Sequence, residues 1–248
     1  MSSNDKERED KESISPTLGD FFINRDYITT SHNFESIEVQ LDCLTCASTD
    51  FDLTGQVIWP AARLLSHFIA ASSGGIRSRL SVIDEDVLEL GSGCGLVGLV
   101  ASFIGIKSIT LSDNEPEVLE ILKLNTRHAC RSVKCRVFEL DWGSIVAEKN
   151  LEIETGRKTW KLILAADVVF WQEAILPLSI TISNLLAKDG VMFLGYFDRA
   201  TNNKVKLETA LIDAGLVFQK ISPLDFLIGN ELSDLDLMTV YEIKWKVV

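Results

Sequence analysis

Acidic residues follow several short apolar segments of this chain, and one of them belongs to a glycine-rich turn. The stretch VLELGSGCGLVGLVA (87–101) places Glu89 two residues before Gly91, with Gly93 and Gly95 following at the same spacing. Several glycines in one turn indicate positive φ angles or the close approach of a ligand, because each glycine costs backbone entropy. A carboxylate in the turn attracts an ammonium group and repels a diphosphate. The pattern therefore predicts a ligand with an amino-acid moiety.

The same turn fits a second pattern. Gly93, Gly95 and Gly98 are spaced as G-x-G-x-x-G, which between a strand and a helix binds the pyrophosphate of a dinucleotide. Glu89 is unfavourable for that ligand, since its charge has the same sign as the phosphates. A dinucleotide-binding protein stays open as the alternative.

The next apolar segment, SITLSD, ends at Asp113, eighteen residues after Gly95. An acidic residue at the end of the second strand of such a unit pairs with ribose hydroxyls and excludes a ribose 2′-phosphate. Asp113 also suits the cap of the helix expected to follow, although Asn114 could provide that cap instead. We expect the carboxylate of Asp113 at the same sheet edge as the glycine turn.

Two more acidic residues end apolar segments further along the chain. Trp142 offers a flat apolar surface for a purine, and Asp141 can accept a hydrogen bond from the purine amino group. A core aromatic under a loop is the alternative for Trp142. Asp167 ends LILAA and precedes VVFW, and a carboxylate among large apolar residues is costly unless it is paired or catalytic. Asp167 is therefore a predicted functional residue, whereas we expect Trp171 to pack.

Short apolar segments alternate with helical patterns over most of the chain, which indicates βαβ units and a doubly wound parallel sheet. The expected strands are 86–90, 108–112, 133–139, 161–166 and 190–196. The expected helices are 60–70, about 95–104, 115–128, 172–187 and 203–214. The segments 215–221 and 237–245 are joined by a polar loop, so they predict an antiparallel pair. The predicted fold is α/β, with a Rossmann-like, seven-stranded, mostly parallel sheet.

The beginning of the chain has a different character. Residues 1–16 are polar and charged, which predicts a disordered tail. The remainder, 17–248, is expected to form a single domain with an N-terminal β extension over 17–58. Within that extension IEVQL and the run 56–58 are candidate strands.

Composition limits the class of partner. The chain has 248 residues, 46% of them hydrophobic, and a formal net charge of -12. This is enough apolar material for one large core. Nucleic acid is not expected as a partner, because binding to phosphates requires clustered Lys and Arg. The charge instead favours a basic partner such as a lysine-rich protein segment, or simply maintains solubility.

We expect no membrane association, because no apolar run approaches the length of a membrane span and the charged N-terminus is unlike a signal peptide. The expected location is the cytoplasm, with the nucleus as the alternative, and the expected state is a monomer. The cysteines are odd in number, which suits reduced thiols in a reducing compartment. They are Cys43, Cys46, Cys94, Cys130 and Cys135. The spacing of Cys43 and Cys46 alone does not supply the four ligands of a zinc site, so no metal is expected.

With these motifs in place, the sequence resembles the seven-strand, S-adenosylmethionine-dependent methyltransferases. More closely it resembles methyltransferase family sixteen, whose members mostly modify lysines of non-histone proteins. The resemblance extends from about Gly55 to Trp245 and rests on five ordered segments. They are GQVIWPAA (55–62), VLELGSGCGLVGLVA (87–101), LSDNEPEVLEILKLN (111–125), ELDWG (139–143) and LILAADVVF (162–170).

The resemblance implies roles for individual residues. The implied cofactor-binding residues are Trp59, Glu89, Gly91, Ser92, Gly93, Asp113, Asn114, Asp141, Trp142, Ala165 and Ala166. Asp167 and Phe170 are implied to face the target amine, and they are the predicted catalytic residues. Tyr is common in the family where this chain has Phe170, which makes the choice of target residue less certain.

The resulting hypothesis is an S-adenosylmethionine-dependent protein methyltransferase that acts on a lysine side chain of a non-histone protein. Arginine, histidine or a small molecule are alternative acceptors. An NAD-dependent oxidoreductase is an alternative from another class, although no convincing Tyr-Lys pair or histidine hydride site is present. A non-catalytic binding module with the same fold is the third alternative.

Overall fold

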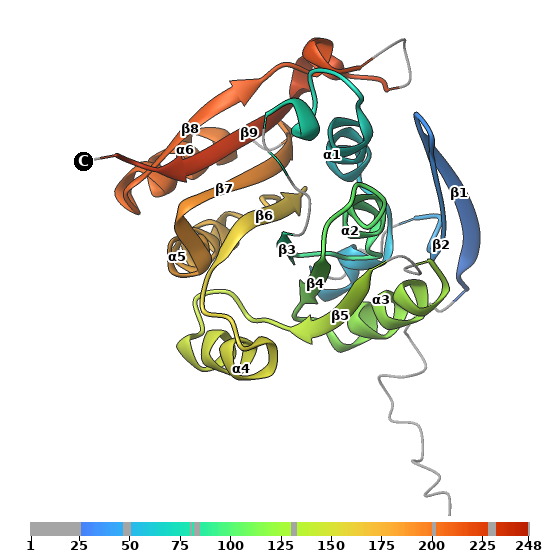
Figure 1. Ribbon diagram of the computed structural model, residues 1–248, viewed down its shortest axis with the longest axis horizontal. Coiled ribbons are helices and arrows are strands. Elements are labelled where there is room, and N and C mark those ends of the chain that lie inside the picture. The colour runs from blue at the N-terminus through green and yellow to red at the C-terminus, as the bar shows by residue number, and fades with distance from the viewer. Residues whose placement is uncertain are drawn as a thin grey trace, which may run out of the picture.

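The computed structural model describes residues 26–46, 51–79, 81, 85–129, 133–199, 202–227 and 232–247 of the chain. The tail expected over 1–16 lies outside the described residues. Two sheets are present, a two-stranded hairpin near the N-terminus and a central seven-stranded sheet. Figure 1 shows the hairpin at one side of the molecule and the last strands of the large sheet at the other.

The central sheet has the order β5-β4-β3-β6-β7-β9-β8. Its strands are β3 (Asp86–Leu90), β4 (Ser108–Asp113), β5 (Lys134–Glu139), β6 (Trp160–Ala166), β7 (Leu186–Phe197), β8 (Leu216–Ile221) and β9 (Met238–Trp245). The first five are parallel to one another, and β9 runs antiparallel to both β7 and β8. The expected mostly parallel sheet with an antiparallel C-terminal pair is confirmed.

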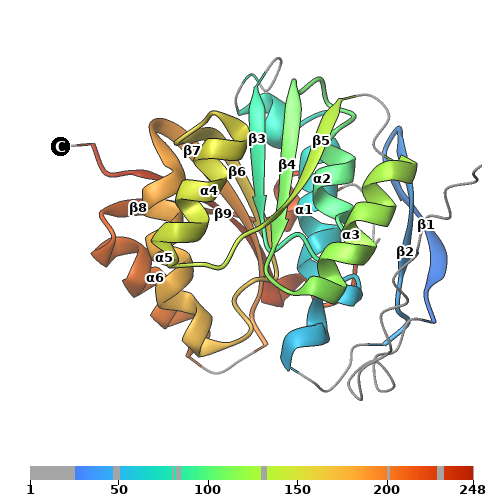
Figure 2. The same cartoon turned by 90° about the horizontal axis from the view of Figure 1, so that it is seen from below.

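Helices cover both faces of this sheet. They are α1 (Pro60–Ala70), α2 (Leu96–Ala101), α3 (Pro116–Ala129), α4 (Ile145–Thr155), α5 (Ile175–Leu185) and α6 (Asn203–Asp213). Short 3-10 turns are η2 (Phe51–Gln56), η3 (Ile76–Ser78), η4 (Gln172–Ala174), η5 (Pro223–Asp225) and η6 (Leu235–Leu237). Figure 2 shows α1, α2 and α3 on one face and α4, α5 and α6 on the other.

The apolar core is divided by the sheet into two clusters. One contains Leu64 and Phe68 of α1 together with Leu111 and Phe193 of the sheet. The other contains residues of α5 and α6 against the opposite side of the same strands, with Trp160 fully buried at its centre. Strands buried on both faces explain why these segments are continuous apolar runs rather than alternating ones.

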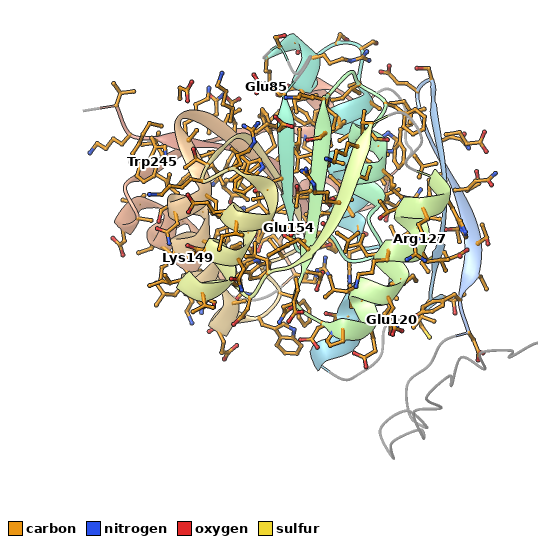
Figure 3. The ribbon with its side chains drawn as sticks, turned by 60° about the horizontal axis from the view of Figure 1, so that its bottom comes forward. Glu85, Glu120, Arg127, Lys149, Glu154 and Trp245 are labelled. Carbon is orange, nitrogen blue, oxygen red and sulfur yellow. The ribbon has the colours of Figure 1, made fainter. Side chains whose placement is uncertain are left out.

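The hairpin of β1 (Ile28–Phe34) and β2 (Ile37–Cys43) packs on α3 and α2. Strand β2 alternates strictly, and its buried residues contribute to the first core cluster. Figures 2 and 3 show α3, marked by Glu120 and Arg127, between this hairpin and the sheet. The side chain of Asn125 on α3 accepts from the Asp42 amide at 2.8 Å and donates to the Asp42 and Cys94 carbonyls. One buried amide thus connects the hairpin to the glycine turn.

Several element boundaries differ from the expectation. The candidate strand over 56–58 is wrong, because η2 ends at Gln56 and an irregular segment follows. Helix α2 covers only Leu96–Ala101, and the expected helix 172–187 consists of η4 and α5, after which β7 begins. The helix α4 was not expected at all. Its residues Ile145, Val146 and Ile153 are exposed and only Leu151 is buried, so it has no apolar face that a periodicity could reveal.

The cysteines differ in part from the expectation. Cys43, Cys46 and Cys94 are free thiols, as expected. Cys135 is disulfide-bonded, so the expectation of a reduced thiol is wrong at this position. Cys130 lies outside the described residues.

None of the helices in the described ranges has the length and apolar character that crossing a membrane requires. Within the same ranges, no cluster of three or more His, Cys, Asp or Glu could hold a metal ion.

We expect Asn125→Ala to lower the free energy of unfolding by about 2–4 kcal/mol, because three buried backbone groups lose a partner. Urea denaturation followed by circular dichroism measures this change. Lys123→Ala on the exposed side of α3 is the control and should alter the free energy of unfolding by less than about 0.5 kcal/mol. Equal small effects of both substitutions would contradict the role assigned to Asn125.

Candidate active site

The strand order places a crevice at one position of the sheet edge. From β3 the chain proceeds outward to β4 and β5, and from β6 it proceeds outward to β7, so the direction changes between the paired strands β3 and β6. In open parallel sheets ligands bind at such a switch point, outside the carboxyl ends of the strands. The loops that follow β3 and β6 are the glycine turn and the segment that begins with Asp167. The topology therefore brings the predicted cofactor and acceptor residues together.

The glycine turn is tied to the end of β4. Ser92 donates its amide to the Ser112 carbonyl at 2.8 Å, and its hydroxyl accepts from the Ser112 amide at 3.1 Å. Gly93 has a φ of 52°, and a Cβ there would come within 2.8 Å of the Gly55 carbonyl oxygen. A left-handed backbone packed against another chain segment requires glycine here. These contacts therefore fix the turn after β3 against the end of β4.

Glu89 is the most unusual polar residue of this turn. Its side chain is only 2% exposed, and the carboxylate oxygen Oε2 has no hydrogen-bond partner among the described residues. Burial raises the pKa of Glu89 to about 8, and the charge of Asp113 adds to this, while the Ser92 hydroxyl and the Gly98 amide oppose it. A buried carboxylate oxygen without a partner is costly. The site is thus suited to a ligand whose cationic group pairs with this carboxylate oxygen.

Gly98 explains how the carboxylate fits. A Cβ at Gly98 would lie 2.5 Å from Oε2 of Glu89 and 2.3 Å from a methyl carbon of Leu111. This glycine, which completes the G-x-G-x-x-G spacing, therefore provides the space beneath the Glu89 carboxylate. In this chain the third glycine of the G-x-G-x-x-G pattern is therefore explained by the Glu89 side chain rather than by a dinucleotide.

Asp113 faces the turn from the end of β4. One carboxylate oxygen accepts from the Gly93 amide at 3.0 Å, and the other accepts from the Asn114 amide at 2.9 Å. Burial raises the pKa of Asp113, and hydrogen bonds from the amides of Gly93, Asn114 and Glu115 oppose the increase. The oxygen that accepts from Gly93 can accept a second hydrogen bond, whereas the other already accepts from the Glu115 amide as well, at 3.5 Å. The two roles expected for Asp113, helix cap and ligand contact, are compatible in this geometry.

A cavity of about 360 Å³ lies between these loops. Every predicted site residue except Ala165 lines it. They are Trp59, Glu89, Gly91, Ser92, Gly93, Asp113, Asn114, Asp141, Trp142, Ala166, Asp167 and Phe170. Ala165 is fully buried in the core cluster that faces α5 and α6, because successive residues of β6 point to opposite faces of the sheet. The prediction that Ala165 lines the site is therefore wrong.

Trp142 forms one wall of the cavity. Its indole lies 3.1 Å from the position of a Cβ on Gly91, and the same ring packs on the core cluster of α5 and α6. It therefore lines the cavity and packs on the core at once, and its contact with a purine stays a prediction. Asp141 lies beside it on the cavity wall.

Asp167 begins the loop after β6 with a φ of 59°. One carboxylate oxygen accepts from the Ala61 amide at 3.1 Å, in the first turn of α1, and the other forms an ion pair with Arg199. Burial raises the pKa of Asp167, while the charge of Arg199 and the hydrogen bonds from Ala61 and Arg199 oppose the increase. The buried side chain of Asn203 donates to the carbonyls of Val169 and Phe170, which fixes the remainder of this loop.

Three aromatic rings surround the Arg199 guanidinium, and we call them the aromatic cage. The central carbon of the guanidinium lies 4.8 Å from the centre of the Trp59 ring, 5.8 Å from the centre of the Phe170 ring and 4.7 Å from the centre of the Phe197 ring. Trp59 is oriented by a 2.8 Å hydrogen bond from its indole nitrogen to the Thr54 carbonyl. The cage therefore adjoins the cavity at the loop that carries Asp167.

Sequence reasoning missed several residues of this region. Arg199 was not predicted, although a charged residue directly after β7, at the carboxyl end of a strand next to β6, is a usable signal. The cavity also includes residues that the tertiary fold brings to it and that have no sequence signature of their own. They are Thr54, Gly55, Val57, Ile58, Ala62, Cys94, Leu96, Val97, Glu115, Val118, Leu140, Val168, Trp171, Glu173, Ala174 and Pro177.

A ligand that completes this site needs an ammonium group, hydroxyls and a flat apolar part. Solved structures confirm the class of fold. A TehB-like SAM-dependent methyltransferase from Corynebacterium glutamicum has a TM-score of 0.50 and 16% identity, and the match covers 77% of this chain and 90% of that one. The fold is thus the Rossmann-like fold of S-adenosylmethionine-dependent methyltransferases.

The family model described as lysine methyltransferase matches residues 38–210. The mouse protein-lysine methyltransferase METTL21E is 31% identical over 54% of this chain and 52% of its own length. The zebrafish (Danio rerio) protein N-lysine methyltransferase METTL21A is 33% identical over 56% of this chain and 58% of its own length. The chain therefore belongs to the lysine methyltransferase family, and it spans a little over half the length of these two relatives.

The buried carboxylate of Glu89 predicts a pH-dependent effect of Glu89→Gln on the protein without ligand. Its pKa of about 8 lies above the ordinary value of 4.5, so its stabilising contribution is complete below pH 4.5 and is lost as the pH rises through 8. We expect Glu89→Gln to raise the free energy of unfolding by about 2–4 kcal/mol at pH 8 and by much less at pH 5. Urea denaturation at both pH values checks this.

The control is Glu152→Gln, at an exposed position of α4. This substitution should change the free energy of unfolding equally at both pH values. A gain for Glu89→Gln that does not depend on pH would show that its carboxyl group ionises normally.

Proposed function

We propose that this chain is an S-adenosylmethionine-dependent protein methyltransferase that transfers a methyl group to a lysine side chain of a non-histone protein. The observation that carries the proposal is the partnerless Glu89 carboxylate oxygen at the glycine turn, in a cavity that is also lined by a second buried carboxylate, Asp167. The first carboxylate suits the amino-acid end of the cofactor, and the second suits the acceptor. The membership of the family supports the same activity.

The described residues fit this cofactor. Glu89 and the turn Gly91–Gly93 would hold the amino-acid moiety, and the remaining acceptor capacity of Asp113 would hold the ribose hydroxyls. Trp142 provides an apolar surface for adenine, with Asp141 next to it. When bound, S-adenosylmethionine supplies a methyl carbon that an amine can attack in line.

The acceptor side of the cavity must provide a neutral amine. A lysine side chain has an ordinary pKa of about 10.4, so removal of its proton near pH 7.4 costs about 4 kcal/mol. The rings of Trp59 and Phe170 lie 6.2 Å apart at this end of the cavity, and Trp171 packs edge-on against Phe170. Such apolar surroundings lower the pKa of an amine by disfavouring its charged form. They also exclude water from the reacting atoms.

Asp167 is the residue that orients the amine. Its carboxylate is held by the Ala61 amide and by the Arg199 guanidinium in the protein without ligand. A hydrogen bond from the amine to this carboxylate directs the nitrogen lone pair toward the cofactor end of the cavity. Phe170 contributes shape and exclusion of water rather than a proton, because it has no hydroxyl.

The alternatives from the sequence have less support. An NAD-dependent oxidoreductase would place a pyrophosphate at the turn where Glu89 lies buried. A non-catalytic module would not need a buried Asp167 with a left-handed backbone, which costs free energy. Among other acceptors, arginine fits the geometry next best, since a guanidinium already contacts Asp167.

Binding of the cofactor should release a proton. Glu89 is largely protonated at pH 7 in the free protein, because its pKa is about 8, and pairing with an ammonium group requires its ionised form. The affinity for S-adenosylmethionine should therefore rise between pH 6 and 8 and level off above pH 8. Calorimetry in buffers with different ionisation enthalpies measures the number of protons released on binding. Glu89→Gln should release no proton and should lose most of the affinity for S-adenosylmethionine.

NAD serves as the comparison ligand for this experiment. It should not stabilise the protein in a thermal shift assay at concentrations where S-adenosylmethionine does. Stabilisation by NAD alone would refute the proposed cofactor.

Asp167→Asn should retain binding of S-adenosylmethionine within a few-fold and lose methyl transfer by about a hundredfold or more. The amide keeps the shape of the side chain but removes the charge that orients the amine. Labelled methyl transfer to proteins of a cell lysate, with mass spectrometry of the modified residue, measures this. Equal losses of binding and of transfer would contradict an acceptor-side role for Asp167.

A further inference from the structure

Arg199 occupies a site that has the features of a cation receptor. Its guanidinium is paired with the 6% exposed carboxylate of Asp167 and lies over the three rings of the aromatic cage, Trp59, Phe170 and Phe197. Carboxylates and aromatic faces together bind ammonium and guanidinium groups, and the attraction is greatest where water is excluded. The Arg199 side chain itself is only 19% exposed.

The cage is continuous with the proposed active site. Asp167, Trp59 and Phe170 line the cavity, whereas Arg199 does not. The guanidinium therefore contacts these three side chains without lining the cavity itself. An acceptor amine that pairs with Asp167 would compete with Arg199 for the same carboxylate.

A second ion pair of this chain shows what a purely structural pair looks like. Arg157 pairs with Asp86 at the opposite end of the parallel strands, and its side chain is 41% exposed. No aromatic ring of the described residues lies over it, and Asp86 also bonds to Ser108. The pKa of Asp86 is held below its ordinary value, whereas burial raises that of Asp167 despite its arginine. The pair of Arg199 and Asp167 is thus more deeply buried than the pair of Arg157 and Asp86. Its arginine also offsets less of the effect of burial on the pKa of the carboxyl group.

We propose that Arg199 is an internal cation that occupies the acceptor subsite, and that the side-chain ammonium of the substrate enters by exchange with it. This inference rests on the proposed function for the identity of the acceptor. The exchange gives Asp167 a cationic partner while the substrate enters in its ammonium form, so its buried charge is compensated during entry. The subsite then selects cationic side chains, because a neutral side chain cannot replace the guanidinium without leaving Asp167 unpaired.

The experiment removes the internal cation and offers small ones. In Arg199→Ala, methylguanidinium and methylammonium chloride should bind the vacated cage with millimolar dissociation constants, measured by calorimetry at constant ionic strength. Both salts should also raise the melting temperature of this variant more than sodium chloride does. No cofactor or protein substrate is present, so the result does not depend on methyl transfer.

Matched variants identify the site of binding. The wild-type protein, whose cage is filled, should bind the same cations at least about tenfold more weakly. Arg157→Ala, which loses an ion pair without a cage, should behave like the wild type. The double variant with Arg199→Ala and Asp167→Asn should lose the binding of the small cations that Arg199→Ala alone shows. Equal responses of all four proteins would overturn the proposal.

A second measurement covers the case that Arg199→Ala does not fold. In the wild-type protein, the Nε–H signal of Arg199 should be shifted upfield by the surrounding rings and should exchange slowly with water in a ¹H–¹⁵N NMR spectrum. Its absence from the spectrum of Arg199→Lys assigns it. A signal at the position of exposed arginines, with rapid exchange, would show that the cage does not hold this cation and would refute the proposal.

Discussion

The structure depends on a buried carboxylate that the protein itself does not neutralise. Glu89 is part of a strand paired on both sides, so its side chain cannot move toward solvent without disturbing the sheet. The space for it comes from the missing side chain of Gly98. A buried acid that is neither paired nor fully hydrogen-bonded reduces stability unless a ligand completes it. The glycines of the turn, the end of β4 and the cavity are arranged around this requirement.

Electrostatics distinguishes the site from the rest of this acidic protein. Several acids elsewhere have cationic partners, as Glu242 has Arg79 and Lys244, which keep its pKa below the ordinary value. At the turn, Glu89 and Asp113 repel each other, and no lysine or arginine of the described residues pairs with either one. A cationic, hydroxyl-bearing ligand relieves both costs together. The glycine turn is therefore recognisable by two neighbouring acids that have no cationic partner among the described residues.

The sequence predicted the sheet well because its central strands contain continuous buried runs, as β3, β4 and β6 do. It predicted α4 poorly, since the local signals at its ends, a capping Ser144 and a left-handed Gly156, are not accompanied by an apolar face. The error at Ala165 has a simple cause: a motif shows that two adjacent residues are small, but only the strand geometry shows which one faces the cavity. Arg199 escaped detection because its significance lies in contacts with residues far away in the chain.

The two ends of the cavity are connected through the beginning of α1. Trp59 precedes this helix and belongs to the aromatic cage, while the amide of Ala61, two residues later, donates to Asp167. The helix N-terminus stabilises the negative charge of Asp167 through its aligned amides, and Pro60 between them has no amide hydrogen that could compete. A displacement of this helix end would change the cover of the cofactor cavity and the position of the acceptor carboxylate at once. Because the same helix is buried along Leu64, Leu65 and Phe68, such a displacement is opposed by the core, and the two parts of the site hold their relative position without a ligand.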